Sequence, residues 1–204
     1  MSAQTVAKLN FNGAKHLHLT GISPGVSASC LEACRAAIAK GREAGLTISF
    51  DPNIRKNLWP TEEAMRTTLN DLAAQCDLVL PGFAEGKLLT GADTPQGIAA
   101  FYRNRGVKTV VVKTGAEGAY YQTADGQCGH VAGFTPPAIV DTVGAGDAFA
   151  AGVITALCEG LPLPQAIARG NAMGALMVSV AGDNEGLPTP QQLQAFMAGA
   201  QRGE

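Results

Sequence analysis

Short apolar segments alternate with longer helical ones along most of the chain, and this alternation limits the fold more than any other feature. The clearest apolar segment is 107–113, where Val107, Val110, Val111 and Val112 supply the β-branched side chains that favour strands. Strands that alternate with helices predict an α/β protein whose mostly parallel sheet carries helices on both faces. In such proteins, ligands bind beyond the carboxyl ends of the strands.

Individual residues mark where the expected elements begin and end. Ser27 and Thr61 are suited to cap helix N-termini, and Asp125-Gly126 predicts a hairpin turn between two strands. The expected strands are 16–20, 46–50, 77–80, 107–113, 119–123, 128–132 and 138–140. The expected helices are 27–45, one that opens at 61, 94–105, 145–158, 165–180 and 189–200.

The length and the overall composition indicate one globular domain. A chain of 204 residues suits a single domain, expected to span 1–204. With 46% hydrophobic and 16% charged residues, it can bury a sizeable core and is not expected to be disordered. The net charge of -2 and the pI of about 5.9 give no broad attraction to nucleic acid or to an anionic membrane. Phosphate binding would therefore be local.

The cysteines favour a reducing compartment. The five of them are scattered and form no CxxC pair, and the three histidines do not complete a zinc site. Reduced thiols in the cytoplasm are the simpler interpretation. The N-terminal residues lack the basic and apolar regions of a signal peptide, and no apolar run reaches membrane-spanning length. We therefore expect a cytoplasmic protein with no membrane partner.

The glycine-rich segment 141–152 carries the strongest chemical signal. Gly144, Ala145 and Gly146 let a polyphosphate approach backbone amides at the start of a helix, where the helix dipole favours negative charge. Asp147 follows in the first helical turn, where a carboxylate would repel phosphate unless it had a role of its own. The role that fits is general base toward a substrate hydroxyl in phosphoryl transfer with Mg²⁺. The alternative is that Asp147 only stabilises the helix start and the glycines only permit close packing.

The run 141–154 resembles the second signature of the PfkB, ribokinase-like carbohydrate kinase family, and the resemblance extends from about 16 to 196. It implies a ribokinase-like three-layer sandwich that uses ATP, Mg²⁺ and, in some relatives, a monovalent cation such as K⁺. It also implies a sugar or sugar-acid acceptor and leaves a homodimer open as the assembly. Family members usually begin with further residues that hold part of the sugar pocket and a small lid, and nothing like them precedes position 16.

Other motifs extend the resemblance to particular roles. The segment 50–55 is similar to one that places an arginine near the substrate in 2-keto-3-deoxygluconate kinases and fructokinase-like members, which implies acceptor binding by Arg55. A fixed guanidinium suits a substrate carboxylate. The run 182–186 is similar to a late substrate-side motif that contains Asp183, and Ile22 lies at a strand end near the expected pocket. The implied nucleotide-side residues are Thr114, Gly115, Glu117, Gly118 and Asn171. Each could instead be an ordinary turn, cap or surface residue.

The metal positions depart from the family pattern. Many relatives carry an asparagine three residues before a glutamate that helps organise Mg²⁺ and its waters, whereas here Gly82 precedes Glu85. The resemblance therefore implies that Glu85 serves Mg²⁺ through water and that Asp141 serves a monovalent cation.

Two other functions fit less well, and a third alternative stays open. Gly21-Ile22-Ser23-Pro24-Gly25 matches the serine-hydrolase elbow, but Pro24 lacks the amide that the oxyanion hole of that motif needs. A dinucleotide-binding protein would carry its glycine turn near the first strand, and no Walker-type phosphate loop occurs. A remnant that binds a nucleotide or a partner without catalysis stays open.

The expected acceptor is a 2-keto-3-deoxygluconate-like acid, with fructose or another sugar second.

Overall fold

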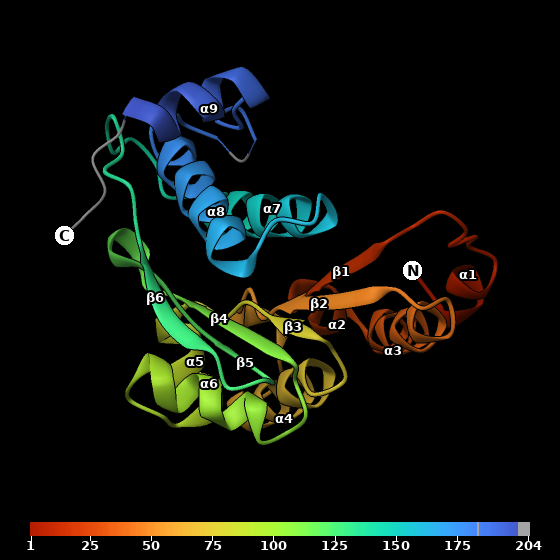
Figure 1. Cartoon of the computed structure of the whole chain (residues 1–204). Coiled ribbons are helices and arrows are strands. Elements are labelled where there is room, and N and C mark those ends of the chain that lie inside the picture. The colour runs from red at the N-terminus through yellow and green to blue at the C-terminus, as the bar shows by residue number, and fades with distance from the viewer. Residues whose placement is uncertain (183, 200–204) are drawn as a thin grey trace. The chain divides into compact units, whose positions relative to one another are not determined.

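The computed structural model of the chain describes residues 1–182 and 184–199 and divides into two compact units (Figure 1). The first unit contains Met1–Val112 and Tyr121–Cys128, and the second contains Lys113–Tyr120 and the chain from Gly129 onward. The single domain expected over 1–204 stays a prediction.

The elements follow the alternation expected from the sequence. Before the fourth strand, the chain forms α1 (Ala3–Ala7), β1 (His16–Thr20), α2 (Ile22–Val26), α3 (Ala28–Glu43), β2 (Thr47–Asp51), η1 (Lys56–Leu58), α4 (Glu62–Ala73), β3 (Leu78–Val79), α5 (Phe83–Thr90) and α6 (Pro95–Arg103). From there it forms β4 (Thr109–Lys113), η2 (Gly115–Glu117), β5 (Gly118–Thr123), β6 (Cys128–Ala132), α7 (Ala145–Cys158), α8 (Leu163–Met177) and α9 (Pro190–Gly199).

The strands form one sheet in the order β1-β2-β3-β4-β5-β6. The first four are parallel, with Leu19 beside Phe50, Phe50 beside Val79 and Val79 beside Val110. Phe50, Val79 and Val110 are almost fully buried, as the apolar strand segments predicted. The expected turn at Asp125-Gly126 is also confirmed, because Thr123 and Gln127 are joined by a backbone hydrogen bond of 2.9 Å.

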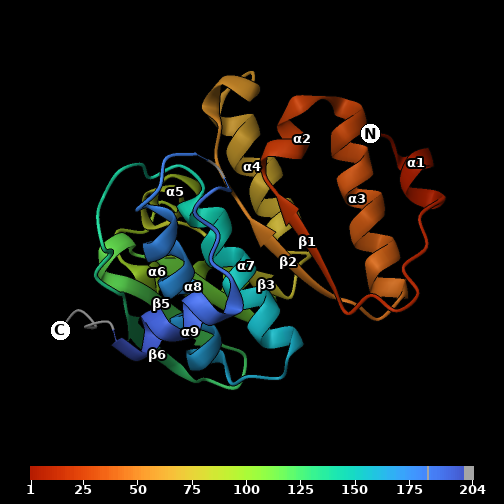
Figure 2. The same cartoon turned by 90° about the horizontal axis from the view of Figure 1, so that it is seen from above.

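The predicted helix starts are confirmed by side-chain caps. Ser27 Oγ accepts the amide of Cys30 at 3.2 Å, and Thr61 Oγ1 accepts the amide of Ala64 at 3.1 Å. These bonds satisfy donors that the first helical turn leaves without partners. Behind the first cap, α3 packs with α1 against β1, as Figure 2 shows, through a cluster of Val6, Ala33 and Ala37 with Leu17 and Leu19.

Two helices of the second unit pack at unusually short range. Gly152 of α7 and Gly170 of α8 face each other, and a Cβ atom placed on Gly152 would lie 2.8 Å from the Cα atom of Gly170. The absence of side chains at both positions therefore lets the two backbones approach closely. This contact fixes α7, whose first turn carries the glycine-rich segment.

One expectation about local structure was wrong, and helices α2 and α5 were not predicted. Segment 138–140 forms no strand; its backbone is bonded to the end of α8 instead. Ile22 follows the end of β1, as expected, and begins a helix, α2, that was not predicted. The stretch after Gly82 is helix α5, because Glu85 accepts the Gly82 amide at 2.9 Å and so caps the helix start.

Asp77, at the start of β3, is a buried carboxylate with several donors. It accepts two bonds from Arg42 Nη1 at 2.7 and 2.8 Å and the Ile48 amide at 2.9 Å, and Lys108 Nζ lies 3.0 Å away. Burial alone would raise the pKa of this carboxyl, but the bonds from Arg42, Ile48 and Lys108 outweigh it and hold the pKa below the ordinary 3.8. The carboxylate therefore ties α3, β2 and the start of β4 together in the first unit.

We predict that Asp77→Asn lowers the free energy of unfolding at pH 7 by about 2 kcal/mol, since charged hydrogen-bond partners would lose their acceptor. Because the folded pKa lies below the unfolded one, the contribution of Asp77 is present above the ordinary value and lost as the pH falls through the folded pKa. Urea titrations from pH 7 to 3 should show the two proteins converging. Asp71→Asn, an exposed change on α4, is the control, and a pH-independent difference would contradict the assignment.

Candidate active site

The start of α7 combines an unusual backbone with an exposed acid. Gly144 is the N-cap with φ 75°, a left-handed conformation that favours glycine, and Ala148 donates the first bond of the helix to Gly144 O at 2.8 Å. The backbone amides of the residues before Ala148 have no hydrogen-bond acceptor within the helix. The Ala145 amide makes only a long bond of 3.4 Å to Thr142 O. Asp147 is exposed in the same turn, so the predicted grouping of Gly144, Ala145, Gly146 and Asp147 at one helix start is present.

Lys113 adds a cation to this helix start, which sequence reasoning did not predict. A Cβ atom placed on Gly146 would lie 3.5 Å from Lys113 Nζ, so the ammonium group lies beside the first turn of α7. A cation next to helix amides strengthens the attraction for an anion such as a phosphate. The sequence feature that could have indicated this role is the position of Lys113 at the end of β4, directly before the 114–118 loop.

The segment before α7 is fastened to the end of α8. Val178 O accepts the amides of Val140 and Asp141 at 2.8 and 3.2 Å, and Ser179 Oγ donates to Ala138 O at 2.9 Å. Asp141 Oδ1 accepts the Val143 amide at 3.0 Å and so closes a turn ahead of Gly144. The half-buried Asp141 carboxylate thus shapes the approach to α7, and its role toward a monovalent cation stays a prediction.

The predicted nucleotide-side loop is a tight turn with one buried, unpaired hydroxyl. The Thr114 amide donates to Gly118 O at 2.8 Å, and η2 lies between them. Gly118 has φ 110°, and a Cβ atom there would lie 2.1 Å from Val131 O, so only glycine fits. Among the described residues, Thr114 Oγ1 is one of two buried side-chain polar atoms without a hydrogen-bond partner. An unpaired buried hydroxyl is costly, which is consistent with a ligand partner.

Asn171 is buried in α8 and holds the end of β6. Its Nδ2 atom donates to Val131 O at 3.0 Å and to Ala132 O at 3.1 Å. Since Gly118 lies against Val131 as well, Asn171 and the 114–118 loop meet at the same point of β6. The structure therefore shows Asn171 as a support of this region, and a direct contact with a nucleotide stays a prediction.

The predicted acceptor-side residues of the first unit lie on two short segments. Ile22 begins α2 and is half-buried. Arg55 is exposed, precedes η1 and donates from Nη1 to Ile54 O at 3.1 Å. Helix α2 packs on η1, which brings the two segments together. Asp183 lies outside the described residues.

Glu85 holds two backbone amides rather than standing free. Its Oε1 atom accepts the Ile54 amide at 2.7 Å, and Oε2 accepts the Gly82 amide. Mg²⁺ typically keeps several waters and takes one or two carboxylates together with substrate phosphates. Within 1–182 and 184–199 there is no group of three or more histidine, cysteine, aspartate or glutamate side chains that could hold a metal. A single carboxylate acting through water is compatible with this donor set.

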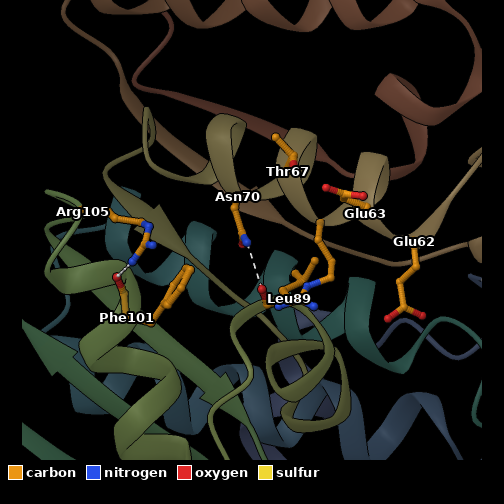
Figure 3. Close-up of a pocket in the computed structure, with 8 residues that line it drawn as sticks. Glu62, Glu63, Thr67, Asn70, Leu89, Phe101 and Arg105 are labelled. Carbon is orange, nitrogen blue, oxygen red and sulfur yellow. Dashed lines mark hydrogen bonds between the residues drawn. The ribbon is translucent and has the colours of Figure 1, made fainter.

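A separate groove with a volume of about 630 Å³ lies in the first unit (Figure 3). It is lined by Glu62, Glu63, Arg66, Thr67, Asn70, Leu89, Phe101 and Arg105. Asn70 Nδ2 donates to Leu89 O at 2.9 Å, and Arg105 Nη1 donates to Phe101 O at 3.0 Å, as the dashed lines in Figure 3 show. Because Asn70 and Arg105 already donate to backbone carbonyls of other lining residues, we assign no ligand to the groove. None of the predicted site residues lines it.

No helix in the described part of the chain is long and apolar enough to span a bilayer.

Comparisons with known proteins point to one family. Residues 1–190 match the family described as "pfkB family carbohydrate kinase". The 2-dehydro-3-deoxygluconokinase of Bacillus subtilis (strain 168) is 48% identical over 192 residues, which are 94% of this chain and 59% of that protein. The chain therefore spans only about three fifths of this relative.

Solved structures give the same result. A PfkB protein from Polaromonas sp. JS666 is 48% identical with a TM-score of 0.82, over 96% of this chain and 62% of that one. A fructokinase double mutant from Vibrio cholerae O395, with bound fructose, ADP and potassium ion, is 26% identical with a TM-score of 0.87, over 97% of this chain and 64% of that one. These likenesses confirm the fold class expected from the sequence.

Proposed function

The chain belongs to the pfkB family of carbohydrate kinases, and we propose that it transfers the γ-phosphoryl group of ATP to a hydroxyl of a sugar or keto-deoxy sugar acid. The observation that carries this proposal is the start of α7. A left-handed glycine cap, an ammonium group beside the first turn and an exposed aspartate occur together there. Phosphoryl transfer requires a protein to bind the negatively charged phosphates and to accept the proton of the attacking hydroxyl.

Asp147 acts as the general base in this proposal. It accepts the proton of the acceptor hydroxyl as that oxygen attacks the γ-phosphorus and the bond to the ADP oxygen breaks. The amides of Gly144, Ala145 and Gly146 stabilise the negative charge of the transferring group. Lys113 adds positive charge at the same helix start. Mg²⁺ supplies further charge neutralisation on the phosphates when bound.

The nucleotide side is formed by the 114–118 loop and its support. The buried hydroxyl of Thr114, which has no partner among the described residues, would donate to or accept from ATP. Gly115, Glu117 and Gly118 shape the turn, and Asn171 keeps β6 against it. Nucleotide binding also fits the ADP present in the Vibrio cholerae structure.

A 2-keto-3-deoxygluconate-like acid is the first proposed acceptor. Arg55 would bind the carboxylate of the acid through its guanidinium group, and Ile22 and Asp183 would contribute to the same side. The name of the Bacillus subtilis relative supports this acceptor. Fructose is the second, supported by the fructose in the Vibrio cholerae structure.

Two metal roles belong to the proposal. Glu85 would contact Mg²⁺ through water, as Mg²⁺ commonly retains its own waters in phosphoryl-transfer sites. Asp141, in the turn ahead of Gly144, would serve a monovalent cation, and K⁺ is present in the Vibrio cholerae structure. The homodimer expected from the resemblance stays a prediction.

The alternative to a kinase is a protein that binds a nucleotide or a partner without catalysis. ATP binding by calorimetry and phosphoryl transfer by ADP release, measured with Mg²⁺ on a panel of sugars and keto-sugar acids, separate the two. Transfer to at least one acceptor supports the kinase, ATP binding without transfer supports the remnant, and neither activity would reject both.

A further inference from the structure

The loop that carries Arg55 has a backbone that needs external support. Asn53 has φ 35°, in the left-handed region that non-glycine residues rarely adopt. Its amide donates to Asp51 Oδ1 at 3.2 Å. Such a conformation persists only where the surroundings hold the chain in place, so the contacts of the next residue matter.

Glu85 provides that support from a different element. One carboxylate oxygen accepts the Ile54 amide at 2.7 Å, directly after the strained Asn53, and the other accepts the Gly82 amide at 2.9 Å. The carboxylate therefore bridges the start of α5 and the loop between β2 and η1. Hydrogen bonds to an ionised acceptor at such distances are among the stronger ones in proteins.

The residue whose amide Glu85 holds also supplies the carbonyl that Arg55 binds. The Ile54 amide is bonded to Glu85, and the Ile54 carbonyl accepts Arg55 Nη1 at 3.1 Å. The Arg55 carbonyl then accepts the Leu58 amide at 3.0 Å and begins η1. A continuous series of bonds thus leads from Glu85 through Ile54 to the guanidinium group.

We propose that Glu85 is a positioning residue for acceptor recognition, because it holds the backbone of Ile54 on its amide side while the Ile54 carbonyl holds Arg55. The inference rests on the proposed acceptor role of Arg55 and adds a role for Glu85 besides any contact with Mg²⁺ through water. The two roles differ in what they change: positioning changes binding of the acceptor, whereas a metal role changes the Mg²⁺ dependence of the reaction.

Trp59 supplies a reporter for this region. It is the only tryptophan in the chain, and its amide donates to Lys56 O at 3.2 Å at the end of η1. Its indole lies against α2, because a Cβ atom on Gly25 would be 3.1 Å from Trp59 Nε1. Emission from Trp59 therefore reports whether η1 keeps its place against α2.

The test compares Glu85→Ala and Glu85→Gln with the control Glu63→Ala, an exposed change on α4. Hydrogen exchange of the Ile54 amide and Trp59 emission are measured without ligand. Exchange of the Ile54 amide in Glu85→Ala should be faster by roughly 10- to 100-fold, because one charged hydrogen bond is lost. The emission of Trp59 should shift to the red. Glu85→Gln keeps one acceptor oxygen, so its values should fall between those of wild type and Glu85→Ala. Unchanged exchange in Glu85→Ala would overturn the positioning role.

A second arm measures binding of 2-keto-3-deoxygluconate by calorimetry, which needs no turnover. Glu85→Ala should weaken binding about tenfold. Adding it to Arg55→Ala should weaken binding no further, because both changes remove the same interaction between Arg55 and the acid. Additive losses, or an altered Mg²⁺ requirement with normal acid binding, would overturn the inference. If the wild-type chain binds no keto-sugar acid, the proposed acceptor is wrong, while the exchange arm still decides whether Glu85 holds the loop.

Discussion

Asp147→Asn is expected to lower kcat for phosphoryl transfer by about 10²- to 10⁴-fold while leaving the affinity for MgATP nearly unchanged. The asparagine side chain has the same shape but cannot accept the proton of the attacking hydroxyl. It also removes a negative charge from a helix start that is proposed to bind a triphosphate, so nucleotide binding has no electrostatic reason to weaken. The kcat is measured by ADP release and the Kd for MgATP by calorimetry.

Asp71→Asn, the same chemical change at an exposed position of α4, is the matched control and should leave kcat and Kd unchanged. A turnover of Asp147→Asn within tenfold of wild type would exclude Asp147 as the base. A parallel loss of ATP binding would instead assign the carboxylate to the nucleotide, for example through a metal ion.

Helix α7, which carries the candidate base, is the element whose bounds the sequence predicted best. The bounds of α7, 145–158, agree with the structure because small residues, a left-handed glycine and an acidic first turn are all local signals. The caps at Ser27 and Thr61 and the turn at Asp125-Gly126 are local in the same sense. The four parallel strands followed from buried apolar runs, which only a sheet covered on both faces explains.

Longer-range contacts set the features that the sequence did not predict. Segment 138–140 is as apolar as a strand, yet its amides are bonded to Val178 and Ser179, about forty residues later. Glu85 matched a metal motif by spacing, whereas its bond to Ile54 joins residues 31 apart. Lys113 lies beside Gly146, 33 residues later in the chain. No local pattern contains such pairings, and the family resemblance gave only the role of each motif.

Gly152→Ala is expected to lower the free energy of unfolding by about 2 kcal/mol, although the substitution adds only one methyl group. The new Cβ atom would lie 2.8 Å from the Cα atom and 3.0 Å from the amide nitrogen of Gly170, and neither backbone atom can move away without shifting α8. Alanine favours helices over glycine by about 1 kcal/mol, so a net loss has to come from the overlap between the helices. Urea denaturation of the purified chain measures it.

Gly174→Ala on α8 is the matched control, because its Cβ atom would lie 3.4 Å from Ala145 O, an ordinary contact distance. This change should raise the free energy of unfolding by about 0.5–1 kcal/mol, through helix propensity and a less flexible unfolded chain. Opposite signs for two glycine-to-alanine changes in one helix pair would show that Gly152 is required by close packing. Equal stabilisation by both would mean that α7 and α8 lie further apart, and the support for the turn that carries Asp147 would then have to come from elsewhere.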